Sequence, residues 1–228
     1  MAAGTGKRMR PITLETPKPL VKVNGVRMID SVIQGLRINH IFEIYIVVGY
    51  QKEKFRYLEK EYPGVTLIEN PYYDTCNNIS SLYAARDYIE DSCILDGDQL
   101  IYNPKILKRE FERSGYNCVW TDEETKEWLL TVENGIVKHC SRTGGREGWQ
   151  LFSISRWSSE DGKKLKGHIE FEFEKNKNRQ IYWDDVALFC FPEEYQLGIR
   201  EMQYGDVVEI DDLQELIALD KSYDKPGQ

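Results

Sequence analysis

Long apolar runs and paired cysteines are both missing from this sequence of 228 residues. No run approaches the roughly 18 apolar residues of a membrane span, and no stretch has the form of a signal peptide. We therefore expect a cytoplasmic protein that does not enter a membrane. The five cysteines show no CxxC spacing, which excludes a typical disulfide framework or zinc site. The three histidines also lack the spacing of metal ligands.

Positive charge is in deficit, because 30 lysines and arginines face 38 aspartates and glutamates. The net charge of -8 argues against nucleic acid or an anionic membrane as a partner, since both attract basic surfaces. An acidic field favours a cationic small ligand instead. The sequence has no internal repeats or low-complexity linkers, and we expect one domain over residues 1–228.

Strand and helix patterns alternate in the first hundred residues. "EIYIVVGY", "VTLIEN" and "SCILDGDQL" have strand patterns, whereas "QKEKFRYLEKEY" and "NISSLYAARDYIED" have helical ones. This alternation predicts an α/β fold with a Rossmann-like, mixed and mainly parallel sheet flanked by helices.

Residues 117–157 depart from this alternation. The "ENG" within "WLLTVENGIVKHC" is a strong hairpin signal, so we expect an antiparallel insertion there. Near the end, "VVEIDDLQELIALD" predicts a strand and then a helix capped by Asp211, with Gln214 in the capping-box position.

The chain opens with the glycine-rich segment "MAAGTGKRMRP". It is not a P-loop, because Arg8 stands where Ser or Thr would bind magnesium, and it lacks the third glycine of a dinucleotide fingerprint. A Gly-Thr-Gly turn remains, whose backbone can approach phosphate oxygens beside Lys7, Arg8 and Arg10. Further on, "TPKPL" holds Lys18 between two prolines in a stiff segment. The alternative is a solvated basic loop.

The stretch "AAGTGKRMRPITLETPKPLVKVNGVRMID" resembles the N-terminal signature of the nucleotidyltransferase superfamily, a glycine-rich loop, an arginine and then Pro-Lys. The segments that follow appear in the order seen in the bacterial CTP:phosphocholine cytidylyltransferases: "YIVVGYQKEKF", "NNISSLYAARD", "SCILDGDQLIY", "EWLLTVENG", "IYWDDVALF" and "VVEIDDLQEL". The resemblance covers nearly the whole chain. Sugar-1-phosphate transferases usually carry a Q-x-x-P-x-G-x-A-like segment where this chain has "NNISSLY", which favours the phosphocholine branch.

The resemblance implies that a phosphate oxygen of phosphocholine attacks the α-phosphorus of CTP, forming CDP-choline and pyrophosphate. Such a transfer depends on alignment and on neutralised phosphate charge. By the resemblance, Arg8 holds the triphosphate and Lys18 faces the reacting phosphates as the catalytic residues. The expected nucleotide contacts of the loop are at Ala3, Gly4, Thr5 and Gly6.

Magnesium is the cofactor that this chemistry implies, and it prefers one or two carboxylates plus phosphate oxygens and water. Asp98 ends a predicted central strand, where α/β folds bind ligands, and Asp184 matches the second aspartate of the family. Asp96 is expected to support the nucleotide site. The alternatives are a polar turn for Asp98 and a helix cap for Asp184 or Asp185, and the sequence leaves open which of these two faces the metal.

The choline head cannot donate an ordinary hydrogen bond, and proteins bind such heads with aromatic faces and carboxylates. The resemblance places Trp128, Tyr182 and Trp183 around choline, with Glu209 as a charge partner. The alternative is that these rings are core packing.

The resemblance also supplies residues for the wall of the cytosine pocket: Gly49, Tyr50, Asn78, Ser80 and Ser81. As an alternative, Asn77 or Asn78 caps the helix that follows.

One departure from the family is the absence of several apolar residues ahead of "AAG", which normally form the first strand. We expect an N-terminally truncated first strand, and the family allows a longer parent chain fused to a choline kinase. Two other functions remain open. One is transfer to another acceptor, such as 2-aminoethylphosphonate, phosphoethanolamine or a sugar 1-phosphate, and the other is nucleotide binding by a non-catalytic regulator. The sequence does not indicate an oligomeric state.

Overall fold

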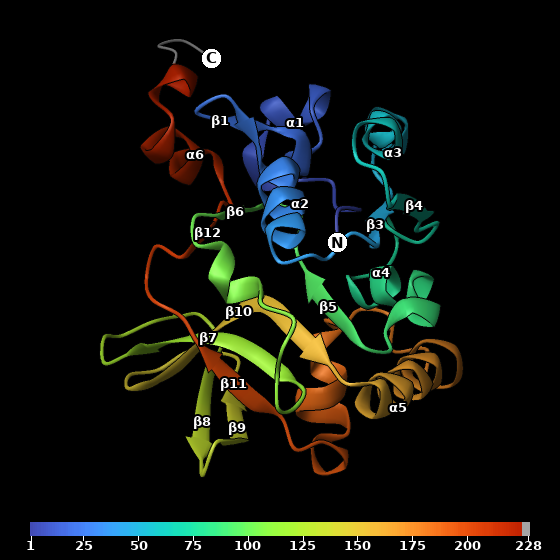
Figure 1. Cartoon of the computed structure of the whole chain (residues 1–228), viewed down its shortest axis with the longest axis vertical. Helices are drawn as coiled ribbons and strands as arrows, with labels where there is room; N and C mark the ends of the chain where they lie inside the picture. The colour runs from blue at the N-terminus through green and yellow to red at the C-terminus, as the bar shows by residue number, and fades with distance from the viewer. Residues whose placement is uncertain (225–228) are drawn as a thin grey trace.

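The largest sheet of the molecule occupies the lower half of Figure 1, in a computed structural model that describes residues 1–224. Residues 225–228 of the expected domain lie outside the described part. Six strands form this sheet: β5 (Ser92–Leu95), β7 (Gly115–Thr121), β8 (Leu129–Glu133), β9 (Ile136–Ser141), β10 (Gly148–Trp157) and β11 (Gly198–Glu201). Strand β10 pairs with β7 on one side and, along different parts of its length, with β8 and β5.

The hairpin of β8 and β9 confirms the antiparallel insertion. Its turn consists of Asn134 and Gly135, with φ values of 51° and 74°. Positive φ at both positions is what a two-residue hairpin turn requires, and Asn-Gly accepts it at little cost. The "ENG" signal therefore predicted this turn correctly.

Three smaller sheets complete the strand pairing in the described residues. They join β1 (Lys22–Val23) to β2 (Val26–Arg27), β3 (Ile44–Val48) to β4 (Val65–Glu69), and β6 (Gln99–Ile101) to β12 (Val207–Glu209). The expected α/β class with mixed sheets is confirmed. Parallel pairing is less frequent than expected, however. Among residues 1–224 it is confined to β3 with β4, β7 with β11, and a single bridge from Ala2 to Val48.

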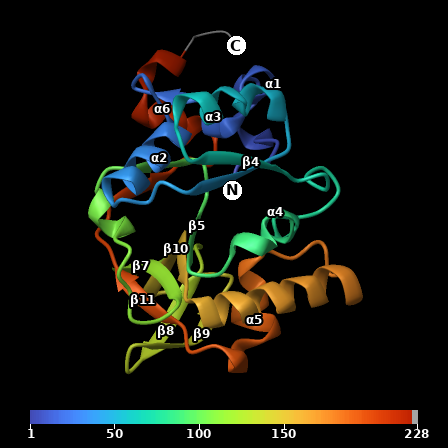
Figure 2. The ribbon, with the colours of Figure 1, turned by 45° about the vertical axis from the view of Figure 1, so that its right-hand side comes forward.

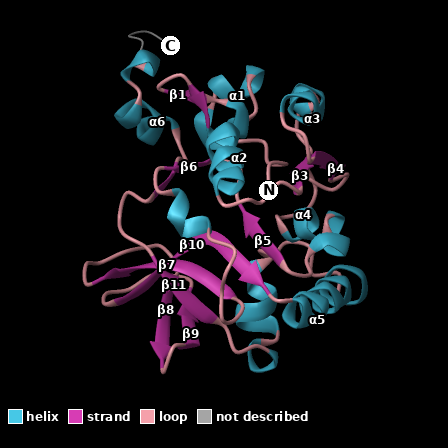
Figure 3. Cartoon of the chain, in the orientation of Figure 1, coloured by secondary structure: helices cyan, strands magenta, loops and turns pink. Residues whose placement is uncertain are grey.

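Helices cover the sheets from both sides, as Figures 2 and 3 show. The α-helices are α1 (Ile12–Glu15), α2 (Met28–Ile38), α3 (Tyr57–Glu61), α4 (Ile79–Ala84), α5 (Ser159–Glu170) and α6 (Leu213–Leu219). Two π-helical segments cover Phe171–Lys175 and Val186–Cys190. Short 3-10 turns cover Lys7–Met9, Lys18–Leu20, Lys52–Phe55, Arg86–Tyr88, Pro104–Leu107, Pro192–Glu194 and Lys221–Tyr223. Within residues 1–224, no helix has the length and apolar character needed to cross a membrane.

The cap of α6 is one residue later than expected. The Asp212 side chain accepts hydrogen bonds from the backbone N–H groups of Gln214 and Glu215. The Glu215 carboxylate in turn accepts a hydrogen bond from the Asp212 N–H, which completes a capping box. The expectation of Asp211 and Gln214 was wrong because two adjacent aspartates offer the same chemistry. Asp212 has the extended backbone of an N-cap, which leaves the Asp211 carboxylate available elsewhere.

The N-terminal residues lie between β3 and β5. The Ala2 N–H donates to the Val47 carbonyl at 2.8 Å, and the Gly97 N–H donates to the Met1 carbonyl at 2.8 Å. A groove of about 940 Å³ continues from these residues along β3 and β5. Apolar side chains of α2 line it, including Val32, Ile33 and Leu36, as do Leu82 and Ile89.

Candidate active site

The glycine loop is fixed against the segment that carries Lys18. Gly6 has φ of 60°, and its carbonyl accepts a hydrogen bond of 2.7 Å from the Thr13 hydroxyl. A Cβ atom at Gly6 would lie 2.9 Å from Thr13 Cγ2 and 3.1 Å from Lys18 Cβ. Glycine is therefore needed here both for its left-handed backbone and for space. The Tyr50 N–H donates to the carbonyl of buried Ala3 at 3.1 Å, which joins the start of the loop to the end of β3.

One cavity of about 350 Å³ brings the predicted catalytic residues together. Gly4, Thr5 and Gly6 line it with Arg8, Lys18 and Asp98, and so does Asp211. Lys18 Nζ donates to Asp98 Oδ2 at 2.5 Å and to Asp211 Oδ1 at 3.1 Å. Arg8 Nη2 donates to the same Asp211 oxygen at 2.8 Å.

The two cations differ in their surroundings. The Lys18 side chain is 10% exposed, whereas the Arg8 side chain is 68% exposed. Burial lowers the pKa of Lys18, but attraction and hydrogen bonds from Asp98 and Asp211 outweigh it, so that the pKa is raised above its usual value. Lys18 is therefore a fixed positive charge at neutral pH, and Arg8 is a solvent-facing one.

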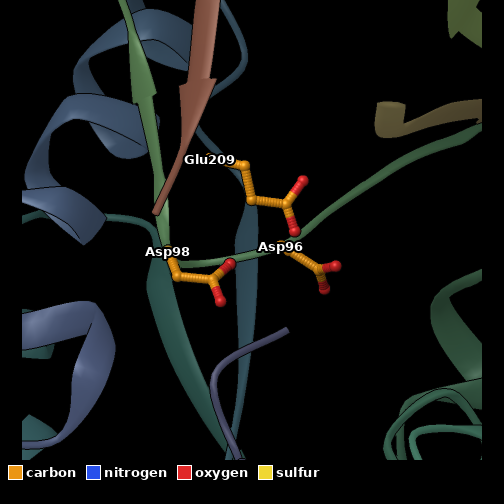
Figure 4. A group of neighbouring side chains, drawn as sticks. All are labelled: Asp96, Asp98 and Glu209. Carbon is orange, nitrogen blue, oxygen red and sulfur yellow. The ribbon is translucent and has the colours of Figure 1, made fainter. Parts of the chain in front are cut away.

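Three carboxylates face a common space beside this cavity. Asp96 and Asp98 lie on the turn between β5 and β6, and Glu209 ends β12, where it pairs with Gln99. One oxygen from each carboxylate lies within 4.8 Å of the others, and Figure 4 shows the three side chains close together with their carboxylates on the same side.

This cluster suits a divalent cation. Burial, together with repulsion from Asp98, raises the pKa of Asp96 to about 6 and that of Glu209 well above its usual value. The buried Asp98 Oδ1 has no hydrogen-bond partner among the described residues. Carboxylate oxygens that repel one another, with one of them unpartnered, suit the oxygen ligands that a hard cation prefers.

Asp184, which was predicted to be a metal ligand, is not part of this carboxylate cluster. Asp184 is 9% exposed and lies outside the carboxylate cluster, because the antiparallel pairing of β6 and β12 brings Glu209 to Asp98 instead. Burial, with repulsion from Asp96 as the second cause, raises the pKa of Asp184 well above its usual value. Asp184 thus lies close enough to Asp96 to respond to its charge. The Asp185 carboxylate is bound to Arg142.

Two of the predicted choline-binding rings lie together. The Trp128 and Tyr182 ring centroids are 5.8 Å apart with planes at 88°, and Tyr182 is 50% exposed. Trp183 is different, because it is 1% exposed and packs against Tyr116 and Trp157. The ring of Trp183 belongs to the core, and its assignment to the choline site is not supported.

Arg142 and Phe189 are parts of this aromatic site that the sequence did not indicate. The Phe189 ring lies 5.6 Å from that of Trp128, and the Arg142 guanidinium lies 3.6 Å from the Phe189 centroid. Arg142 follows strand β9 by one residue, in a loop without a recognisable motif. Only the proximity of Arg142 to Asp185 in space points to Arg142 as part of this site, and that proximity is visible only once the fold is known.

Some of the residues expected to form the wall of the cytosine pocket are buried and bonded to other side chains. Ser80 and Ser81 are buried, and both hydroxyls accept hydrogen bonds from Asn70 Nδ2, at 2.9 and 3.1 Å. Asn78 does not cap α4 through its side chain, since its Oδ1 accepts from the Trp183 N–H at 2.9 Å. Gly49 and Tyr50 follow β3 directly, and a Cβ at Gly49 would lie 2.6 Å from the ring of Tyr73.

A glycine loop, a buried lysine and a carboxylate cluster at strand ends define a nucleotidyltransferase. A family model described as the MobA-like NTP transferase domain matches residues 1–157, and the chain belongs to this family.

Curated relatives extend the similarity over nearly the full length. The chain is 36% identical over 226 residues to a 2-aminoethylphosphonate cytidylyltransferase of Lancefieldella rimae, covering 98% of this chain and 91% of that protein. It is 30% identical over 221 residues to a choline-phosphate cytidylyltransferase of Streptococcus pneumoniae, covering 97% and 95%. A solved CTP:phosphocholine cytidylyltransferase of the same species has a TM-score of 0.89 at 31% identity, covering 97% of this chain and 96% of that one. The chain is thus related to cytidylyltransferases throughout.

Proposed function

We propose that this protein transfers the cytidylyl group of CTP to phosphocholine and releases pyrophosphate. The observation that carries the proposal is the shared cavity lined by the glycine loop, Arg8, Lys18 and Asp98. Cationic side chains around one cavity supply the alignment and charge neutralisation that the transfer needs. The names of two relatives, both choline-phosphate cytidylyltransferases, support the choice of substrates.

The residues of the cavity have separate tasks in this proposal. The backbone N–H groups of the loop and the exposed Arg8 hold the triphosphate. Lys18 lies deeper and neutralises the α-phosphate, where negative charge increases as the acceptor oxygen attacks. When the triphosphate binds, its oxygens take the place of the carboxylates beside the Lys18 ammonium, so the ammonium stays paired.

Asp98 and Glu209, with Asp96, would hold the Mg²⁺ that such transfers use. When bound, the ion neutralises phosphate charge and aligns the two phosphates. Without a cation, the three carboxylates depend on protonation and on Lys18 for charge compensation, as the raised pKa values of Asp96 and Glu209 indicate. Glu209 therefore moves, in this proposal, from the choline site to the metal site.

The choline head is assigned to Trp128 and Tyr182. The two rings lie 5.8 Å apart, and Tyr182 is half exposed, so a cationic head can reach its ring from solvent. Cation–π contacts of this kind contribute ~0.5–2 kcal/mol each. Repulsion from Asp96 is a cause of the raised pKa of Asp184, so Asp184 responds to the charge of the carboxylate cluster.

A second acceptor, 2-aminoethylphosphonate, is favoured by one comparison. The relative with that activity in its name is 36% identical, against 30% and 31% for the two choline-phosphate relatives. Both acceptors join a phosphorus-centred anion to a cationic nitrogen. The nitrogen of phosphocholine carries three methyl groups, whereas the nitrogen of 2-aminoethylphosphonate carries N–H groups.

The experiment that tests the proposal measures pyrophosphate release in the presence of Mg²⁺. The four common nucleoside triphosphates are crossed with phosphocholine, 2-aminoethylphosphonate, phosphoethanolamine and a sugar 1-phosphate. We expect turnover with CTP and phosphocholine. Turnover with CTP and 2-aminoethylphosphonate alone would establish the second acceptor. If no pair releases pyrophosphate while calorimetry still detects CTP binding, the protein is a nucleotide-binding regulator and not an enzyme.

A further inference from the structure

The guanidinium of Arg142 is held in one orientation. Its Nε and Nη2 atoms both donate to Asp185 Oδ1, at 2.9 and 2.6 Å. The Asp185 side chain is 5% exposed, and its second oxygen accepts from the Tyr182 N–H at 2.8 Å. A buried carboxylate with three such bonds is a rigid anchor, so the cation cannot swing into solvent without leaving a buried charge unpaired.

This anchored cation already lies on the aromatic site. Arg142 Cζ is 3.6 Å from the centroid of Phe189 and 5.9 Å from that of Trp128. Both distances are within the range of about 6 Å over which a ring attracts a cation. Part of the ring surface that could bind the cation of a ligand is therefore already in contact with the Arg142 guanidinium.

The two candidate acceptors depend on that surface to different extents. A trimethylammonium group has no N–H, so aromatic faces and diffuse negative charge are all that hold it. A primary ammonium has three donors and can bind a carboxylate oxygen directly. A primary ammonium therefore depends less on ring surface than a trimethylammonium group does.

We propose that Arg142 is a specificity-determining residue that shifts acceptor choice from a quaternary toward a primary ammonium. The inference rests on the proposed cytidylyl transfer at this site. Arg142 occupies ring surface and repels both heads, but the primary ammonium loses less, because its N–H groups can also donate to oxygen acceptors. Arg142 is not among the residues that line the triphosphate cavity or form the carboxylate cluster, so we expect its effect mainly on the acceptor.

The test compares Arg142→Met and Arg142→Lys with the native protein. The methionine keeps apolar bulk and removes the charge, whereas the lysine keeps a charge for Asp185 and removes the planar group from the rings. Arg146→Met is the matched control, because Arg146 lies in the same loop, is exposed, and donates from Nε only to the Asp122 carbonyl.

We measure kcat and KM for phosphocholine and 2-aminoethylphosphonate at saturating CTP and Mg²⁺. For Arg142→Met, the ratio of kcat/KM for phosphocholine to that for 2-aminoethylphosphonate should rise roughly tenfold, through KM, as one cation–π site is freed. Arg142→Lys should give a smaller rise of about threefold, and Arg146→Met should leave the ratio unchanged. If the methionine variant does not fold, the lysine variant decides alone.

Equal changes for both acceptors would overturn the inference, because they would show that Arg142 only supports Asp185 and Tyr182. An unchanged ratio in a folded, active variant would overturn it as well and would leave the proposed function intact. Calorimetric titration with each acceptor measures the same preference without turnover. If the native protein neither binds nor converts either acceptor, the proposed function and this inference fail together.

Discussion

Replacement of Lys18 by methionine is the sharpest test of the cavity, because one side chain there has both a structural and a chemical task. Its Nζ lies 2.5 Å from one carboxylate oxygen and 3.1 Å from another, and its side chain is 10% exposed. Methionine keeps the apolar part of the side chain and removes only the charge. The change therefore isolates the ammonium.

The loss of stability follows from the exposure of the partners. Removal of one member of a buried ion pair costs about 3–5 kcal/mol, whereas exposed pairs contribute about 0–1 kcal/mol. The Asp98 and Asp211 side chains are 21% and 38% exposed, which places this case between the limits, at about 2–3 kcal/mol. For a chain of this size, that corresponds to a fall in melting temperature of about 5–10 °C.

The loss of activity should be larger. Removal of one group that stabilises developing charge typically lowers kcat by about 10²–10³, or about 3–4 kcal/mol. Pyrophosphate release reports this loss, and differential scanning fluorimetry reports the melting temperature. Lys22→Met is the control, because Lys22 is an exposed lysine on β1 outside the cavity. A folded Lys18→Met protein with kcat within tenfold of the native value would refute the proposed role.

Three other expectations concern separate parts of the molecule. Trp128→Ala should raise KM for phosphocholine roughly tenfold with little change in stability, whereas Trp183→Ala should cost about 3–5 kcal/mol in urea unfolding because its ring is 1% exposed. Since the pKa of Asp96 is raised to about 6, its ionised form is disfavoured in the folded state. The metal-free protein should therefore lose stability as pH rises from about 4 to about 6, and calorimetric Mg²⁺ affinity should weaken below about pH 6.

The residues of the candidate cavity were predictable because they lie in short continuous segments of the sequence. Arg8 and Lys18 lie ten residues apart in segments that match the family's N-terminal signature, and the resemblance identified both. Asp98 lies in the turn that follows β5, and α/β sheets place their ligands at such strand ends. The structure brings all three to one cavity.

The structure differs from the sequence-based expectations where the position of a side chain depends on long-range pairing or on which way it points. Glu209 reaches Asp98 because β12 pairs antiparallel with β6, and strand patterns carry no information on direction. Tyr182 and Trp183 are adjacent, yet one is 50% exposed and the other 1%. Composition cannot separate them, and Arg142 has no local pattern at all.

The contact between Gly6, Thr13 and Lys18 has a consequence for ligand affinity. The Thr13 hydroxyl closes onto the Gly6 carbonyl while the Lys18 stem fills the space that a side chain at Gly6 would need. The turn consequently has its working shape before any nucleotide arrives. A preorganised anion receptor loses little conformational entropy on association, so more of its intrinsic attraction for phosphate appears as measured affinity.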